Sequence, residues 1–113
     1  MVKLKYLNPD EQKALDEFLS ELFTNFEGQV DSLCLFGSKA RGESTEESDI
    51  DLLIIFKNIH NKREIIRWLS EVESEINMKY GVLISSYPID RNYYESHKYF
   101  SFLRNIEAEG IPL

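Results

Sequence analysis

The sequence predicts an α/β (α+β) fold in which a small mixed β-sheet carries helices mainly on one face. Two apolar stretches, Val30 to Phe36 and Ile50 to Phe56, have the length and composition of strands. The segment between them is too short for a full βαβ crossover, so we expect these strands to be antiparallel. Helical patterns before and after them predict the order α-β-(short α)-β-α-β-α.

The segment that follows Asn8 predicts the first helix. Asn8 is a favourable N-cap residue, Pro9 suits the first helical position, and acidic residues follow in the first turn. Gly28 is expected to end the helix. The apolar side chains that recur at helical spacing are Ala14, Leu15, Phe18, Leu19 and Leu22.

The middle of the chain predicts a central strand followed by a second long helix. The strand Ile50 to Phe56 is apolar on both faces beyond Asp51, which is typical of a strand inside a sheet. A turn at 58–61 leads to a helix that ends near Gly81. Its apolar face consists of Ile65, Leu69, Val72 and Ile76.

The last third of the chain predicts one strand and one terminal helix. The strand covers Val82 to Tyr87, and Pro88 is expected to stop it. A helix from about Tyr93 to Glu109 follows, with Gly110 as its end. This segment is rich in aromatic side chains, which either pack in the core or form an exposed patch for a partner. They are Tyr93, Tyr94, Tyr99, Phe100 and Phe102.

Length and charge limit the classes of function. A chain of 113 residues suits one domain spanning 1–113, and a net charge of −7 disfavours general binding of DNA or RNA. The sequence has one cysteine, no signal peptide and no apolar run near the ~20 residues of a membrane span, so a cytoplasmic protein that binds no membrane is expected. An acceptor substrate is then a small molecule or a protein.

Asp49 and Asp51 are the candidate catalytic and metal-binding residues. They open the second strand two positions apart, so their carboxylates point to the same face. A divalent cation relieves their repulsion, and oxygen ligands of this kind suit Mg²⁺ or Mn²⁺. The Gly37-Ser38 turn precedes a short helix and suits an anion such as phosphate. A solvated strand end is the plainer interpretation of an isolated pair of aspartates.

Other interpretations of the same segment were weighed. Gly37 to Ser44 has the glycine spacing of a P-loop but places Glu43 where that loop requires lysine, which disfavours a P-loop because glutamate repels the phosphates. Arg41 has two open roles: it binds nucleotide by stabilising charge on a phosphate, or it pairs on the surface with Glu43, Glu46 or Glu47.

The stretch GSKARGESTEESDID resembles a known family. Gly37-Ser38, the ten positions 39–48 and Asp49-x-Asp51 match the signature of the DNA polymerase β-like nucleotidyltransferases. The short length and the ending FLRNIEAEGIPL are similar to the minimal nucleotidyltransferases of bacteria and archaea. The resemblance implies the polymerase β-like fold, catalytic metals (Mg²⁺ or Mn²⁺) held by Asp49 and Asp51, and a nucleoside triphosphate, ATP, whose terminal phosphates lie on Gly37 and Ser38.

The resemblance also implies a third acidic residue on a later strand, and this chain departs from that pattern. Ser85 stands at the expected position. Asp90 is the nearest carboxylate, but it lies five residues on, roughly 16 Å at about 3.3 Å per residue, and faces the opposite side of the strand. Nucleotide and metal binding are therefore more strongly implied than full catalysis.

Two hypotheses of function follow. In the first, the chain is a metal-dependent nucleotidyltransferase that moves a nucleoside monophosphate from NTP to a hydroxyl of a protein or small-molecule acceptor. In the second, it is a nucleotide-binding module with little or no turnover that acts as an antitoxin or scaffold by contact. Because 113 residues hold only about half of the usual cleft, a second chain or subunit is expected. The resemblance names a HEPN-domain toxin as a candidate partner, with a homo-oligomer as the other option.

Overall fold

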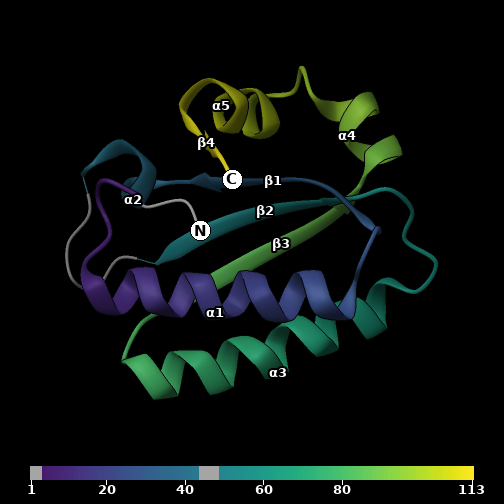
Figure 1. Ribbon diagram of the computed structural model, residues 1–113. Helices are drawn as coiled ribbons and strands as arrows, with labels where there is room; N and C mark the ends of the chain where they lie inside the picture. The colour runs from purple at the N-terminus through teal and green to yellow at the C-terminus, as the bar shows by residue number, and fades with distance from the viewer. Residues whose placement is uncertain (1–3, 44–48) are drawn as a thin grey trace.

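The computed structural model describes residues 4–43 and 49–113. The first two strands have the predicted bounds, and the predicted order of elements is confirmed as far as the third strand (Figure 1). In chain order the elements are α1 (Pro9–Asn25), β1 (Val30–Phe36), α2 (Ser38–Arg41), β2 (Ile50–Phe56), α3 (Lys62–Tyr80), β3 (Ile84–Asp90), α4 (Arg91–His97), α5 (Ser101–Glu109) and β4 (Ile111–Pro112).

The strands of the described residues form one sheet in the order β3-β2-β1-β4. β1 is antiparallel to β2, as the short connection predicts, and β2 is parallel to β3. The sheet is therefore mixed. β2 lies inside it, as expected of a strand that is apolar on both faces, whereas β3 lies at its edge.

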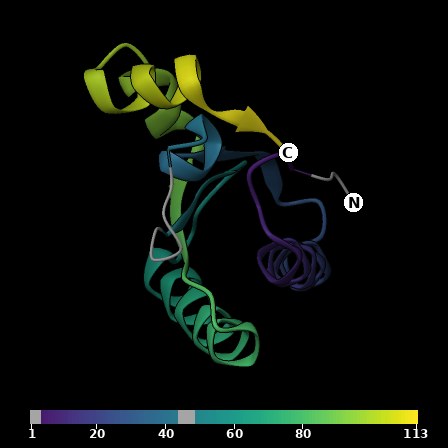
Figure 2. The ribbon, with the colours of Figure 1, turned by 90° about the vertical axis from the view of Figure 1, so that its left-hand side faces the viewer.

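Helices cover the two faces of the sheet unequally. The long helices α1 and α3 pack on one face, and the short helices α4 and α5 lie on the other (Figures 1 and 2). The main core lies under the long helices, and every second side chain of β2 points into it. These fully buried β2 side chains are Ile50, Leu52, Ile54 and Phe56. A smaller cluster faces the short helices and consists of Leu53, Ile55, Leu103 and Ile106.

The start of α1 is set by a capping box. The Asn8 side chain accepts a hydrogen bond from the Glu11 backbone N–H at 2.8 Å, and the Glu11 carboxylate accepts one from the Asn8 backbone N–H at 3.0 Å. The helix ends at Asn25, three residues before the predicted stop at Gly28. Within residues 4–43 and 49–113, no helix has the length and apolar character needed to span a bilayer.

The predicted end of the third strand is wrong. β3 begins at Ile84 and continues through Pro88 to Asp90. One side of β3 pairs with β2, and its other side is the edge of the sheet. At this edge the Ser86 backbone N–H donates a hydrogen bond to the Glu73 carboxylate rather than to another strand. Pro88 is two residues further on, so its nitrogen faces the same edge and breaks no ladder bond. Edge position is a property of the whole sheet, which the local sequence does not contain.

The predicted terminal helix is also wrong, because it is two helices. α4 ends at His97, whose Nδ1 forms a hydrogen bond with the Tyr93 carbonyl at 2.9 Å. Phe100 then adopts an extended conformation (φ −79°, ψ 151°) and begins α5. The end of α5 at Gly110 is confirmed.

The chain closes with a two-residue strand that the sequence analysis did not predict. Ile111 and Pro112 of β4 pair with Leu35 and Cys34 of β1. Gly110 makes this approach possible, because a Cβ there would lie 2.3 Å from the Cys34 Sγ. The tail therefore fixes α5 against β1.

Candidate functional site

Asp49 and Asp51 lie at the start of β2, on the face of the sheet that α4 and α5 cover. Asp51 is followed on this face by Leu53 and Ile55, which pack against α5. Ser85 of β3 is the register partner of Asp51. The two aspartates predicted as catalytic and metal-binding residues therefore lie on one face, beside the strand that was expected to supply a third acid.

Ser85 contacts the carboxylate pair directly. Its Oγ donates a hydrogen bond to Asp49 Oδ2 at 2.9 Å, while its backbone is in register with Asp51. Asp90, the other carboxylate considered for this role, lies at the far end of β3 and caps α4 by accepting from the Tyr93 backbone N–H at 2.8 Å. Asp49, Asp51 and Ser85 thus bring two carboxylates and one hydroxyl together at the starts of β2 and β3.

The environment of Asp51 disfavours its negative charge. Partial burial raises the pKa of the Asp51 carboxyl above its usual value, and the negative charge of Asp49 raises it further. No group of three or more His, Cys, Asp or Glu side chains suited to a metal occurs in residues 4–43 and 49–113. Two carboxylates nevertheless fit Mg²⁺, which commonly takes one or two and completes its shell with water and substrate phosphate.

The Gly37-Ser38 turn lies against this carboxylate pair. Gly37 has φ 77°, a conformation that favours glycine, and a Cβ there would lie 2.5 Å from Asp51 Oδ2. Phe36, the preceding residue, is the register partner of Asp51 in the antiparallel pair of β1 and β2. The absence of a side chain at Gly37 therefore lets the Asp51 carboxylate pack directly against the backbone of the Gly37-Ser38 turn.

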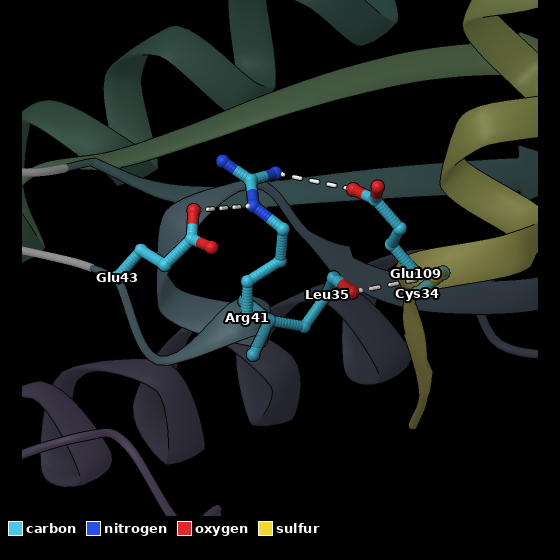
Figure 3. A network of polar contacts seen from close by, with 5 residues as sticks. All are labelled: Cys34, Leu35, Arg41, Glu43 and Glu109. Carbon is cyan, nitrogen blue, oxygen red and sulfur yellow. Dashed lines mark hydrogen bonds and ion pairs between the residues drawn. The ribbon is translucent and has the colours of Figure 1, made fainter.

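Arg41 forms surface ion pairs, as one of its two predicted roles requires. Its Nε contacts Glu43 Oε2 at 3.1 Å, and a terminal nitrogen contacts Glu109 Oε2 at 3.3 Å (Figure 3). The hydrogen bond to Glu43 is the main cause of a raised pKa of the Arg41 guanidinium. The proposed partners Glu46 and Glu47 lie outside the described residues. Glu109 was not anticipated, since it is far away in the sequence.

Figure 3 also shows the environment of the single cysteine of the chain. The Cys34 thiol donates a hydrogen bond to the Leu35 carbonyl at 3.4 Å, and burial raises the pKa of this thiol. Cys34 is half-buried and packs at the rim of the smaller apolar cluster. It behaves as a small apolar residue.

Tyr87 is a neighbour of the site that the sequence analysis missed. It lies on the same face as Ser85, two positions further along β3, and its ring packs against Phe36 with centroids 5.6 Å apart. Burial raises the pKa of the Tyr87 hydroxyl, and the charges of Asp51 and Asp49 add to this effect. Strand side chains two positions apart share a face, so the position of Tyr87 relative to Ser85 could have identified it. Tyr87 also lines a cleft of about 510 Å³ between β3, α3 and the short helices.

One family model and two curated proteins match most of the chain. The family model described as "Polymerase beta, Nucleotidyltransferase" matches residues 17–112. "Putative protein adenylyltransferase MJ0604" of Methanocaldococcus jannaschii is 34% identical over 104 residues, which cover 92% of this chain and 98% of that protein. "Putative protein adenylyltransferase MJ0141" of the same organism is 35% identical over 102 residues, covering 88% and 94%.

Solved structures share the fold. A structure described as a "putative minimal nucleotidyltransferase" aligns with a TM-score of 0.59 at 23% identity, covering 96% of this chain and 99% of that one. A toxin-antitoxin structure with AMP-PNP aligns with a TM-score of 0.53 at 17% identity, covering 86% and 70%. The predicted α/β fold of the polymerase β type is thus confirmed, and the chain belongs to the polymerase β-like nucleotidyltransferase family.

Proposed function

We propose that the chain is a metal-dependent nucleotidyltransferase that moves AMP from ATP to a hydroxyl of a protein acceptor. The acceptor oxygen attacks the α-phosphorus, the bond to the bridging oxygen breaks, and pyrophosphate leaves while the hydroxyl proton is released. The observation that carries this proposal is the close approach of the Gly37-Ser38 turn to Asp51, with Asp49 on the same face. The names of the relatives, protein adenylyltransferases, support AMP and a protein acceptor.

Each residue has a role in binding or orientation. Asp49 and Asp51 hold the divalent cation, Mg²⁺ or Mn²⁺, and Ser38 with the Gly37 backbone orients the terminal phosphates. When bound, the cation favours deprotonation of the attacking hydroxyl and neutralises the leaving pyrophosphate. Arg41 reaches a phosphate only by exchanging its contacts with Glu43 or Glu109. Positioning of the reactants accounts for most of the acceleration.

The strand order supports an approach of the acceptor over β3. The leaving phosphates are anchored at the end of β1, the carboxylates stand on β2, and Ser85 and Tyr87 stand on β3, so the three groups lie in a row across the sheet. Attacking and leaving oxygens are roughly in line in phosphoryl transfer. The acceptor hydroxyl therefore approaches over β3, where the cleft beside Tyr87 is open.

Ser85 makes transfer by this chain slow. A site with two carboxylates carries less negative charge than one with three, so a second cation binds weakly, and a serine hydroxyl is a poor base. The Ser85 hydroxyl also donates a hydrogen bond to Asp49 Oδ2. A base from the acceptor protein, or the phosphates of the nucleotide, takes over the proton.

A second candidate function rests on a separate observation. Aromatic side chains on α4, α5 and their connection are exposed, with Tyr99 at 76% and Phe100 at 64%. A surface of this kind suits a protein partner. The toxin-antitoxin structures with the same fold make a HEPN-type toxin the candidate, and contact alone then inhibits it.

Transfer from [α-³²P]ATP separates the two functions. The chain is incubated with Mn²⁺ and the protein encoded by the neighbouring reading frame, and label on that protein is measured. We expect slow labelling that increases in Ser85→Asp and disappears in Asp51→Asn. The second function is supported if the wild type and Ser85→Asp both bind the partner protein tightly and neither of them labels it. The melting temperature of Ser85→Asp is measured alongside, because a third carboxylate beside Asp49 and Asp51 lowers it by charge repulsion.

A further inference from the structure

A buried ion pair lies directly behind the Gly37-Ser38 turn. Lys39 Nζ contacts Glu11 Oε2 at 2.6 Å, and the two side chains are 4% and 7% exposed. Glu11 and Lys39 are the buried charged residues in the part of the chain that the structure describes. Lys and Glu are rarely buried to this extent unless they are paired, so the contact fixes both side chains strongly.

The Glu11 end of this pair is rigid. Its Oε1 accepts the Asn8 backbone N–H at 3.0 Å within the capping box, while its Oε2 holds Lys39. Both carboxylate oxygens are therefore bound, and the residue belongs to the first turn of α1. That helix is anchored by fully buried side chains such as Phe18 and Leu22. The position of Glu11 is thus set by the main core of the protein.

The Lys39 end belongs to an element that needs support. α2 is a single turn of four residues, Ser38–Arg41, and an isolated turn of this length is unstable because nucleation is costly. Lys39 points into the protein towards α1, whereas Arg41 of the same turn points to the surface. The side chain next to Ser38 in the sequence is therefore the one tied to the core.

We propose that Lys39 is a positioning residue: through its ion pair with Glu11 it orients Gly37 and Ser38 for the terminal phosphates of the nucleotide. The proposal rests on the proposed function of this turn. Lys39 does not contact the nucleotide. The ion pair holds the one-turn helix α2 against the rigid helix α1. Loss of the pair should therefore weaken the contacts of Ser38 and the Gly37 backbone with the β- and γ-phosphates.

Two single variants test this proposal by calorimetry with Mn²⁺ present. Lys39→Met keeps the length of the side chain and removes its charge. Glu11→Gln removes the charge and keeps an oxygen for the Asn8 N–H. We expect each to weaken ATP binding by about tenfold, comparable to the loss of one charge-assisted hydrogen bond, while AMP binding changes much less. The double variant is expected to be no worse than either single one.

Lys79→Met is the matched control, because it removes another ion pair of α1, that of exposed Lys79 with Glu17 at 2.7 Å, which does not involve α2. It should leave ATP binding unchanged. Equal losses for ATP and AMP, unchanged ATP binding in a folded variant, or additive losses in the double variant would each overturn the proposal. If Lys39→Met does not fold, Glu11→Gln still decides the question. Absence of Mn²⁺-dependent ATP binding in the wild type would instead contradict the proposed function itself.

Discussion

The two faces of the sheet differ in what they hold, although the same central strand serves both. On the face of α1 and α3, alternate β2 side chains are fully buried among aliphatic and aromatic groups. On the face of α4 and α5, the same strand begins with Asp51, and the covering helices are short and carry exposed aromatic rings. The face of α1 and α3 therefore contributes most of the free energy of unfolding. The other face can then carry the two aspartates, although their mutual repulsion is destabilising.

The largest difference between the faces should appear in stability. Phe18→Ala removes a fully buried ring from the α1 face and should lower the free energy of unfolding by about 3–5 kcal/mol. Phe102→Ala removes a ring that is 57% exposed on the other face and should cost about 1 kcal/mol or less. Urea denaturation of both variants measures the difference. Similar losses would show that the α5 face contributes as much as the main core.

The next prediction concerns the phosphate end of the site. Ser38→Ala should weaken binding of ATP by about 1.5–3 kcal/mol, because the hydroxyl loses a hydrogen bond to a charged phosphate. AMP lacks the terminal phosphates and should be affected much less. Calorimetry with both nucleotides in Mn²⁺ measures the two losses. Equal weakening of ATP and AMP would place Ser38 away from the terminal phosphates.

The smallest predicted effect lies at the sheet edge between the faces. Burial raises the pKa of the Glu73 carboxyl, and its hydrogen bonds from Ser86 offset this only in part. The folded chain therefore binds this proton more tightly than the unfolded chain, and the stability that the group contributes at low pH is lost as pH rises through the folded pKa. Glu73→Gln should raise the melting temperature near neutral pH.

The advantage of Glu73→Gln should shrink as pH falls from neutral through the raised folded pKa, and it should be lost near the 4.5 of an ordinary glutamate. Glu75→Gln, on an exposed position of the same helix, is the control and should show no such trend. A lower melting temperature for Glu73→Gln than for the wild type at neutral pH would contradict this account of the edge. A difference in melting temperature between the two that does not change with pH would also contradict it.

The regions that the sequence predicted well are those with local signals. The bounds of β1 and β2 follow from apolar runs closed by turns, and the start of α1 follows from a capping box within four residues. The position of Ser85 beside the aspartates follows from a family pattern and agrees with its contact to Asp49. The strand and helix signals each lie within one element, whereas the Ser85 prediction depends on the family pattern.

The features that the sequence did not predict depend on contacts between distant segments. Pro88 lies inside β3 because that strand is at an edge, and the partner of Arg41 at Glu109 is 68 residues away. The pair of Lys39 with Glu11 joins two helices whose relative position no local pattern contains. Such features follow only from the assembled fold.

The most direct test of the central claim is calorimetry of ATP binding with and without Mn²⁺ in the double variant Asp49→Asn with Asp51→Asn. Glu71→Gln with Glu75→Gln, on exposed positions of α3, is the charge-matched control. We predict that the aspartate variant loses the metal-dependent part of binding while its melting temperature equals or exceeds that of the wild type, since the repulsion between the carboxylates is removed. Undiminished metal-dependent binding of ATP in that variant would contradict the assignment of the site.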